Sequence, residues 1–294
     1  MHTLMSHPYV PSKRKDTTNL VTLMPSTFPL EIEEIILDLL ADEDDKGLST
    51  LKTCSLVCQA FLPICRKHIY RSITLNDSDS ESPTIYDAFE RLLRETPKIA
   101  DCIRTLDYTV QIVYNPSIQE TLKRISRLEF FSVRVLHHYW HEVTKASNWS
   151  DNPIRPALLH LLHLPTLTRF KVAGFENFLV SDLIPCVNLK YLEIGRKTNV
   201  AAKNIFPATF PDHPIRLNEF VAQFKSPDAI MKLCTAQGPN GQPIIDFTSL
   251  SKITVGIQDL AEGEAHQELF RRCHFLTNAH ISCKLYLHCD HQNF

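Results

Sequence analysis

Glycine is scarce in this chain, with seven glycines among 294 residues. Nucleotide-binding loops use closely spaced glycines because a backbone without side chains can wrap closely around a phosphate. The sequence contains no Gly-x-x-x-x-Gly-Lys loop and no Gly-x-Gly-x-x-Gly motif, and it also lacks the Gly-x-Ser-x-Gly elbow of serine hydrolases. These absences argue against nucleotide chemistry, and we expect a protein that is not an enzyme.

Long apolar runs are also missing. No stretch approaches the ~20 apolar residues that a membrane-spanning helix needs, and residues 1–25 hold no apolar segment of signal-peptide length. The formal net charge of -2 gives no electrostatic reason to bind nucleic acid. We therefore expect a cytoplasmic or nuclear protein without membrane or nucleic-acid partners, in which residues 1–25 form a disordered polar tail.

Metal-binding patterns are incomplete. Nine cysteines, an odd number at scattered spacing, are expected to be reduced thiols that serve as small apolar residues. His141 and Glu142 begin like a zinc-protease motif, but Lys145 stands where the second histidine ligand is needed. His137, His138 and His141 lie at helical spacing beside aromatic residues, so we expect a packed aromatic face there.

A denser group of metal-ligating residues lies near the C-terminus within nineteen residues: Cys273, His274, His280, Cys283, His288, Cys289 and His291. Structural zinc sites usually bring their ligands in close pairs, whereas nine residues separate Cys273 from Cys283. The alternation of Ile281, Cys283, Leu285 and Leu287 instead predicts a strand with Cys283 facing the core. We therefore expect no metal and no cofactor.

Three short helical patterns occupy residues 26–75. Pro29 suits the first turn of a helix, and Glu31 follows where the helix dipole favours negative charge. After the acidic residues 42–45 a second periodic stretch begins, and Pro63 suits the start of a third helix. The first helix carries one apolar stripe at helical spacing: Ile32, Ile35, Ile36, Leu39 and Leu40.

The apolar residues of this segment exceed what three short helices can bury among themselves. Two interpretations are open: a partner protein covers the surplus, or the rest of the chain packs against it. Cys54, Cys58 and Cys65 are expected to lie in the core of the three helices, and Ile36 and Leu40 are candidates for its inner side.

The segment resembles an F-box, a module that docks onto a Skp-family adaptor protein. The family pattern is Leu-Pro-x-Glu-Leu, then two apolar positions four and eight residues further on, and later Val-Cys-x-x-Trp. The matching positions in this chain are Phe28, Pro29, Glu31, Ile32, Ile36, Leu40, Val57, Cys58 and Phe61. Phe28 stands where leucine is usual, and Phe61 stands where tryptophan is usual. Residues 51–57 and 71–75 further resemble F-box proteins that are numerous in mushroom-forming fungi.

This resemblance implies an apolar surface for the adaptor, formed by Phe28, Pro29, Ile32, Val57 and Phe61. It also implies a substrate-recruiting adaptor of a Skp-cullin-F-box type ubiquitin ligase, which holds a target protein near a conjugating enzyme. The alternative is an F-box-like interaction protein without ubiquitin-ligase function, because Phe28 and Phe61 depart from the family pattern. The target protein is not named by the sequence.

The pattern Leu-x-x-apolar-x-apolar recurs after residue 75. Its alternation predicts short strands with one buried face. The copies are 22, 61 and 26 residues apart, and Leu217 divides the long gap into 28 and 33. These spacings lie near or above the leucine-rich-repeat period of about 20 to 29 residues. The copies begin at Leu167, Leu189 and Leu250, with weaker members at Ile103, Leu128, Leu217 and Leu276.

Helical patterns lie between these strands, at residues 86–94, 155–162, 226–234 and 261–273. A repeated order of strand and helix implies parallel strands in a curved array. We expect an α+β protein overall, with a short three-helix F-box at 26–75 and an irregular α/β leucine-rich-repeat-like solenoid at 76–294. A plain α/β domain stays open as the alternative, because most copies lack the asparagine that commonly follows the repeat strand.

An array of this kind presents one face of strand residues to a macromolecule. Polar positions on that face include Arg169, Lys171, Lys190, Tyr191 and Glu193. Single polar residues at a protein surface are usually just solvated, so the sequence alone assigns none of them to a site.

Overall fold

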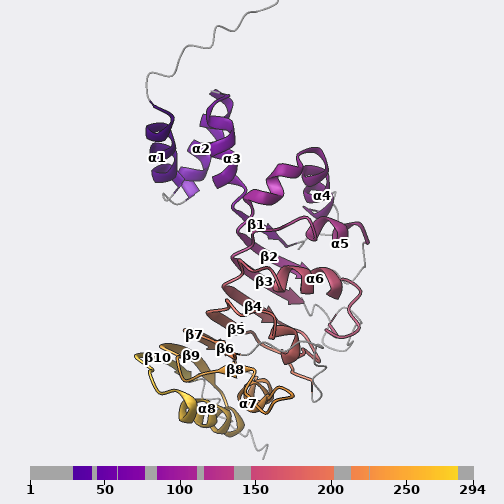
Figure 1. Ribbon diagram of the computed structural model, residues 1–294, viewed down its shortest axis with the longest axis vertical. Coiled ribbons are helices and arrows are strands. Elements are labelled where there is room, and N and C mark those ends of the chain that lie inside the picture. Colours follow the sequence, from indigo (N-terminus) through magenta and orange to yellow (C-terminus); the bar gives the residue numbers. More distant parts are fainter. Residues whose placement is uncertain are drawn as a thin grey trace, which may run out of the picture.

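The chain forms a three-helix unit that leads into a long parallel β-sheet (Figure 1). The computed structural model describes residues 29–41, 45–57, 59–76, 85–110, 116–135, 147–201, 213–224 and 226–283. The predicted polar tail at 1–25 and Phe28 lie outside these residues. Within the described ranges, no helix has both the length and the apolar character to cross a membrane.

The three-helix unit confirms the predicted number of helices in this segment. It consists of α1 (Leu30–Ala41), α2 (Asp45–Val57) and α3 (Phe61–Ile69). Leu37, Leu51 and Cys65 form its small buried core. A close polar contact joins α3 to α1, with His68 Nε2 2.7 Å from Asp38 Oδ1. Cys65 is buried as predicted, Cys54 is half-buried, and Cys58 lies outside the described residues.

Eight strands follow one another in chain order across a single sheet, and every neighbouring pair is parallel. The strands are β1 (Ser72–Leu75), β2 (Thr105–Val110), β3 (Phe130–Val135), β4 (Arg169–Ala173), β5 (Tyr191–Ile194), β7 (Glu219–Ala222), β9 (Lys252–Ile257) and β10 (Asn278–Cys283). Two shorter strands, β6 (Ile215–Arg216) and β8 (Ile245–Asp246), pair separately.

The recurring sequence pattern accounts for seven of these strands, from β2 to β10. Strand β1 was not predicted, and it pairs with β2, so the sheet begins inside the segment that resembles an F-box. The alternation places one apolar residue of each strand in register with those of its neighbours. One such row is fully buried: Leu106, Phe131, Phe170, Leu192, Phe220 and Ile253.

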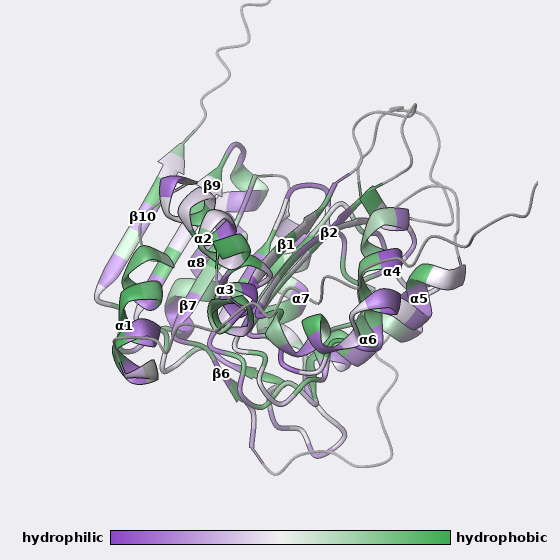
Figure 2. Cartoon of the chain, turned by 90° about the horizontal axis from the view of Figure 1, so that it is seen from above, coloured by the Kyte–Doolittle hydropathy of each residue, from purple (hydrophilic) through white to green (hydrophobic). Residues whose placement is uncertain are grey.

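Helices cover the apolar face of the sheet. They are α4 (Ile85–Glu95), α5 (Pro116–Leu122), α6 (Arg155–Leu162), α7 (Pro227–Thr235) and α8 (Leu260–Arg272), with two 3-10 helices at Pro97–Cys102 and Val180–Leu183. Figure 2 shows α4, α5 and α6 together on one side of the strands. The helical patterns predicted α4, α6, α7 and α8, whereas α5 is too short to show a clear period. The structure is thus mixed α/β, as expected in outline.

Polar side chains join the helices to β2 and to the 3-10 helix Val180–Leu183. The Tyr86 hydroxyl on α4 donates a hydrogen bond to the Thr109 carbonyl oxygen at 2.6 Å. On the next helices, Arg155 donates to both carboxylate oxygens of Asp182 at 2.9 and 2.8 Å, and the Trp149 indole donates to Asp182 Oδ2 at 2.7 Å. These bonds give buried polar groups a partner, which offsets the cost of taking them out of water.

One prediction about the last strand is wrong. Cys283 does lie on a strand, on the side of the buried Ile253 and Val255 of β9, but its own side chain is exposed and is not part of the core. The reason is that β10 is the edge strand of the described sheet, and α8 packs over β9. Within the described ranges, no three His, Cys, Asp or Glu residues are placed to hold a metal ion. His137, His138, His141, His288, Cys289 and His291 lie outside the described residues.

The buried His266 makes the stability of the C-terminal part depend on pH. This residue on α8 is 1% exposed, and its Nε2 lies 3.1 Å from the Gly256 carbonyl oxygen. Burial lowers the pKa of His266, and the hydrogen bond with the Gly256 carbonyl and the nearby Glu262 only partly oppose this effect. A lowered folded-state pKa means that the unfolded chain binds a proton more readily.

Neutral His266 is therefore expected to contribute its full share to the free energy of unfolding above the unfolded-state pKa of about 6.5. This contribution should be lost as the pH drops below that value. Urea unfolding at neutral and mildly acidic pH measures this loss. His266→Gln keeps a donor for the Gly256 carbonyl but cannot titrate, so it should lose less stability on acidification than the natural chain. An equal loss in both proteins would contradict the assignment.

Candidate protein-docking surface

The apolar stripe of α1 faces solvent, away from the core of the three-helix unit. Ile32, Ile35, Ile36 and Leu39 have exposed fractions of 42, 55, 47 and 64%. We call these four residues the outer stripe. The inner face of α1 carries Glu33, Leu37 and the half-buried Leu40. The sequence expectation that Ile36 faces inward is therefore wrong, while the one for Leu40 is correct.

The end of α2 exposes two more apolar side chains. Leu56 and Val57 have exposed fractions of 88 and 77%. Figure 1 shows that α1 begins, α2 ends and α3 begins at the same end of the unit, which is the end farthest from the sheet. The structure thus brings Pro29, Val57 and Phe61 to one end of the three-helix unit, with Ile32 one turn into α1.

Phe61 differs from the other predicted docking residues. Pro29, Ile32 and Val57 are exposed, whereas Phe61 is half-buried and packs against the small core around Leu51. A substitution of Phe61 is thus expected to weaken this core as well as any contact with a partner. Its place in docking stays a prediction.

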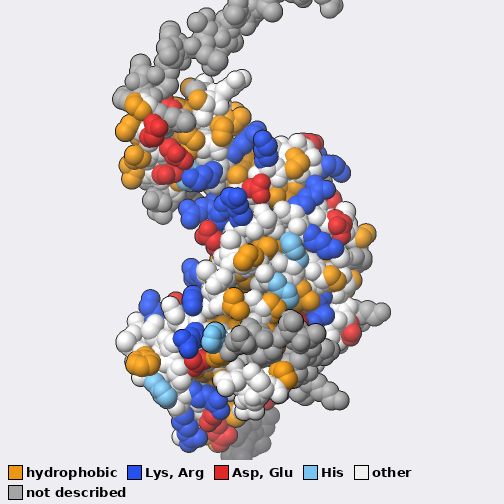
Figure 3. All heavy atoms as spheres, viewed as in Figure 1, with side chains coloured by type: hydrophobic (Ala, Val, Ile, Leu, Met, Phe, Trp, Pro, Cys, Tyr) orange, Lys and Arg blue, Asp and Glu red, His pale blue; other side chains and the backbone are white. Residues whose placement is uncertain are grey.

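The rest of the described chain does not cover the outer stripe. The core of the three-helix unit is separate from the main core, which begins at Leu75 and runs through the sheet. The two parts meet through α3 and the 3-10 helix Pro97–Cys102. Figure 3 shows hydrophobic side chains at the outer flank of the unit, next to acidic ones. Exposed apolar side chains gathered in this way are typical of contact surfaces.

Sequence reasoning missed several members of this surface. Ile35, Leu39 and Leu56 were not among the predicted docking residues, yet they are at least as exposed as Ile32. The available signal was the excess of apolar residues over what three helices can bury. That excess predicts that some apolar side chains stay exposed, but it does not identify which face of α1 carries them.

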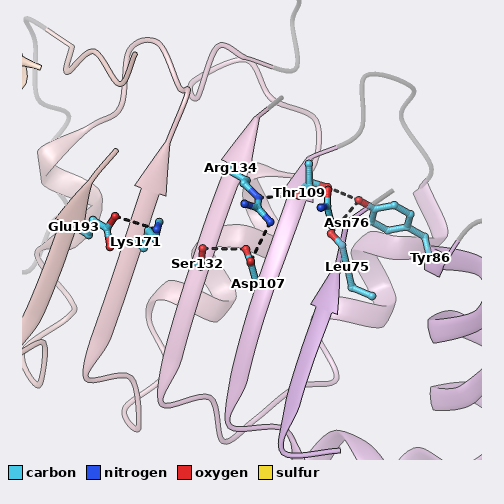
Figure 4. A network of polar contacts seen from close by, with 9 residues as sticks. All are labelled: Leu75, Asn76, Tyr86, Asp107, Thr109, Ser132, Arg134, Lys171 and Glu193. Atoms are coloured by element: carbon cyan, nitrogen blue, oxygen red, sulfur yellow. Dashed lines mark hydrogen bonds and ion pairs between the residues drawn. The ribbon is translucent and has the colours of Figure 1, made fainter. Parts of the chain in front are cut away.

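The strand face, meaning the face of the sheet opposite the helices, is polar. Figure 4 shows side chains standing in front of its strands. Arg134 Nη2 donates to Asp107 Oδ2 at 3.0 Å, and Ser132 Oγ donates to the other oxygen of that carboxylate at 3.0 Å. Further along, Lys171 Nζ lies 2.9 Å from Glu193 Oε1. Each ion pair joins two neighbouring strands, and within each pair the two opposite charges neutralise each other.

Glu193 accepts further hydrogen bonds on the same face. The Tyr191 hydroxyl donates to Glu193 Oε2 at 2.6 Å, and Gln223 Nε2 donates to Glu193 Oε1 at 2.7 Å. Burial raises the pKa of Tyr191, and the hydrogen bond to the Glu193 carboxylate raises it further, so the hydroxyl stays protonated. Of the polar positions that the sequence placed here, Arg169 and Lys190 are exposed, while Lys171 and Tyr191 are half-buried.

No protein-family model matches the chain, and no curated protein matches it in sequence. Any assignment of the docking surface therefore depends on the residue pattern and on the exposure of the residues just described.

The orientation of α1 can be tested with two identical substitutions. Leu37 is buried in the small core and Leu39 is 64% exposed on the outer stripe. Leu37→Ala is expected to reduce the free energy of unfolding by about 2 to 5 kcal/mol, because it leaves a cavity. Leu39→Ala should stay within about 0.5 kcal/mol of the natural chain. Chemical unfolding followed by circular dichroism measures both, and similar losses would show that the outer stripe is packed.

Proposed function

We propose that this chain is the substrate-recruiting adaptor of a Skp-cullin-F-box type ubiquitin ligase. In this proposal the three-helix unit is an F-box that binds a Skp-family adaptor protein, and the sheet binds a target protein. The main support is the exposed apolar surface at the end of the three-helix unit, formed by Pro29, the outer stripe, Leu56 and Val57. It lies on the segment that resembles an F-box.

The exposed residues suit a stable protein contact. Standard interfaces bury about 1,600 Å² in total, and a few large apolar side chains supply most of the affinity. The outer stripe and the α2 end offer six large aliphatic side chains, each at least 42% exposed: Ile32, Ile35, Ile36, Leu39, Leu56 and Val57. Leaving these side chains in water is unfavourable, and a partner that covers them would recover that free energy.

We further propose that the eight-stranded sheet is an irregular leucine-rich-repeat-like solenoid. Two observations support this proposal. The strands are parallel and follow one another in chain order, and a buried leucine or isoleucine precedes most of them. Such an array leaves its strand face available for a target protein. Catalysis would then belong to other subunits, in the cytoplasm or the nucleus, and this chain would contribute proximity without being an enzyme.

The placement of the two surfaces fits an adaptor. The exposed ends of α1 and α2 lie at the end of the molecule farthest from the sheet (Figure 1). A protein bound there would leave the strand face free, so both partners could bind together.

Val57 provides a direct test of adaptor docking. Val57→Asp introduces a charge at a 77% exposed position, so it should disturb the fold little but place an unpaired carboxylate in the interface. We expect the affinity for a recombinant Skp-family adaptor to fall about 30-fold or more, the size of a hot-spot loss of about 2 kcal/mol. Isothermal titration calorimetry measures the affinity, and a melting curve checks folding.

Met231→Asp is the matched control, because Met231 is a 39% exposed apolar residue on α7, far along the chain from the three-helix unit. It should leave adaptor binding unchanged. Equal losses in both variants would count against docking through α2. If the natural chain binds the adaptor without recruiting a cullin, or binds neither, the alternative of an F-box-like interaction protein without ligase function is favoured.

A further inference from the structure

One arginine on the strand face lies over two aromatic rings that contact each other edge to face. Phe130, Arg169 and Tyr191 occupy equivalent positions on β3, β4 and β5, as the strand register shows. The Arg169 guanidinium carbon lies 5.1 Å from the centre of the Phe130 ring and 4.7 Å from the centre of the Tyr191 ring. Both rings are half-buried, and the arginine is exposed.

Two carboxylates of the strand face are engaged by other cations. Asp107 pairs with Arg134, and Glu193 pairs with Lys171. Arg169 makes no ion pair within the described part of the chain, so its N–H groups are available to a ligand. Its only described contacts through the guanidinium are with the two rings.

The surroundings of Arg169 are more basic than acidic. Lys190 directly precedes Tyr191, and Lys252 lies in the same cross-strand row; both are exposed and have no ion pair among the described residues. Glu219 is the one carboxylate of that row in the described sheet. Figure 3 shows blue Lys and Arg side chains gathered along the hollowed side of the molecule. The unpaired charge is therefore complementary to an acidic ligand.

The two rings prepare Arg169 for such a ligand. A guanidinium packed against aromatic rings loses less freedom on binding, and its planar fork of N–H groups matches both oxygens of a carboxylate. Tyr191 is itself fixed, because its hydroxyl donates to Glu193 at 2.6 Å. The position of the guanidinium is thus determined by the fold.

We propose that Arg169, held by Phe130 and Tyr191, binds a carboxylate side chain in an extended acidic segment of the target protein. This inference rests on the proposed use of the strand face for target binding, and it does not depend on the adaptor surface. Single-stranded nucleic acid fits less well, because bases need free aromatic faces and Arg169 already lies over both rings.

The test uses the full-length chain and a fluorescein-labelled peptide of alternating glutamate and serine. Fluorescence anisotropy at low salt measures binding, with a lysine-serine peptide and an oligouridine as competing probes. The natural chain should bind the glutamate peptide in preference to both. Arg169→Gln should weaken that binding about tenfold or more, the loss expected for a charged hydrogen-bonded pair.

Two further variants separate the specific role of Arg169 from general charge. Arg169→Lys keeps the charge but loses the planar fork, so it should restore only part of the affinity. Arg91→Gln removes an exposed arginine on α4, on the helix side of the sheet. It should change the affinity for the glutamate peptide less than twofold, because an exposed charge away from the binding face contributes little. Equal effects of Arg91→Gln and Arg169→Gln, or no effect of either, would overturn the proposal.

The same proteins distinguish this inference from the proposed adaptor function. Arg169→Gln should retain affinity for the Skp-family adaptor, and Val57→Asp should retain affinity for the glutamate peptide. Absence of peptide binding with intact adaptor binding would reject the acidic-target inference alone. Preference of the natural chain for the oligouridine or the lysine peptide would reject it as well.

Discussion

The structure depends on apolar residues of neighbouring parallel strands stacking in register. Each strand is short, and its inward residues are buried only because the strands on either side supply matching residues, as Phe131, Phe170 and Leu192 do at the centre of the sheet. The helices then close this apolar layer from one side. The same alternation turns every second residue toward the strand face, so one constraint defines both the core and the polar surface opposite it.

The two candidate surfaces follow different physical rules. The surface on the three-helix unit is apolar, and burial by a partner would drive its use. The strand face is polar and mostly self-paired, as in the Asp107–Arg134 and Lys171–Glu193 pairs, so binding there depends on the few groups left without a partner. Arg169 stands out for this reason. The two candidate surfaces therefore differ in chemistry and lie at separate places on the molecule.

Much of the fold could be predicted from the sequence, because the repeated pattern reflects a local periodicity. Seven strands and four of the covering helices were predicted near their observed positions. Strand β1 was missed because Tyr70 stands where the pattern has its leading leucine, two residues before the strand. The candidate site was predicted less completely: Ile32 and Val57 are exposed, but Phe61 is half-buried, and Leu39 and Leu56 were not foreseen. Cys283 was misplaced because edge position is not a local property.

The sequence by itself determined where helices and strands form and that more apolar residues are present than three short helices can bury. Those properties depend on spacing along the chain, which periodicity records directly. Only the tertiary structure decided which face of α1 turns toward α2 and α3, and that choice left the outer stripe in water. It also decided that Arg169 lies over Phe130 and Tyr191, since these residues come from three strands and meet only when the sheet fixes their register.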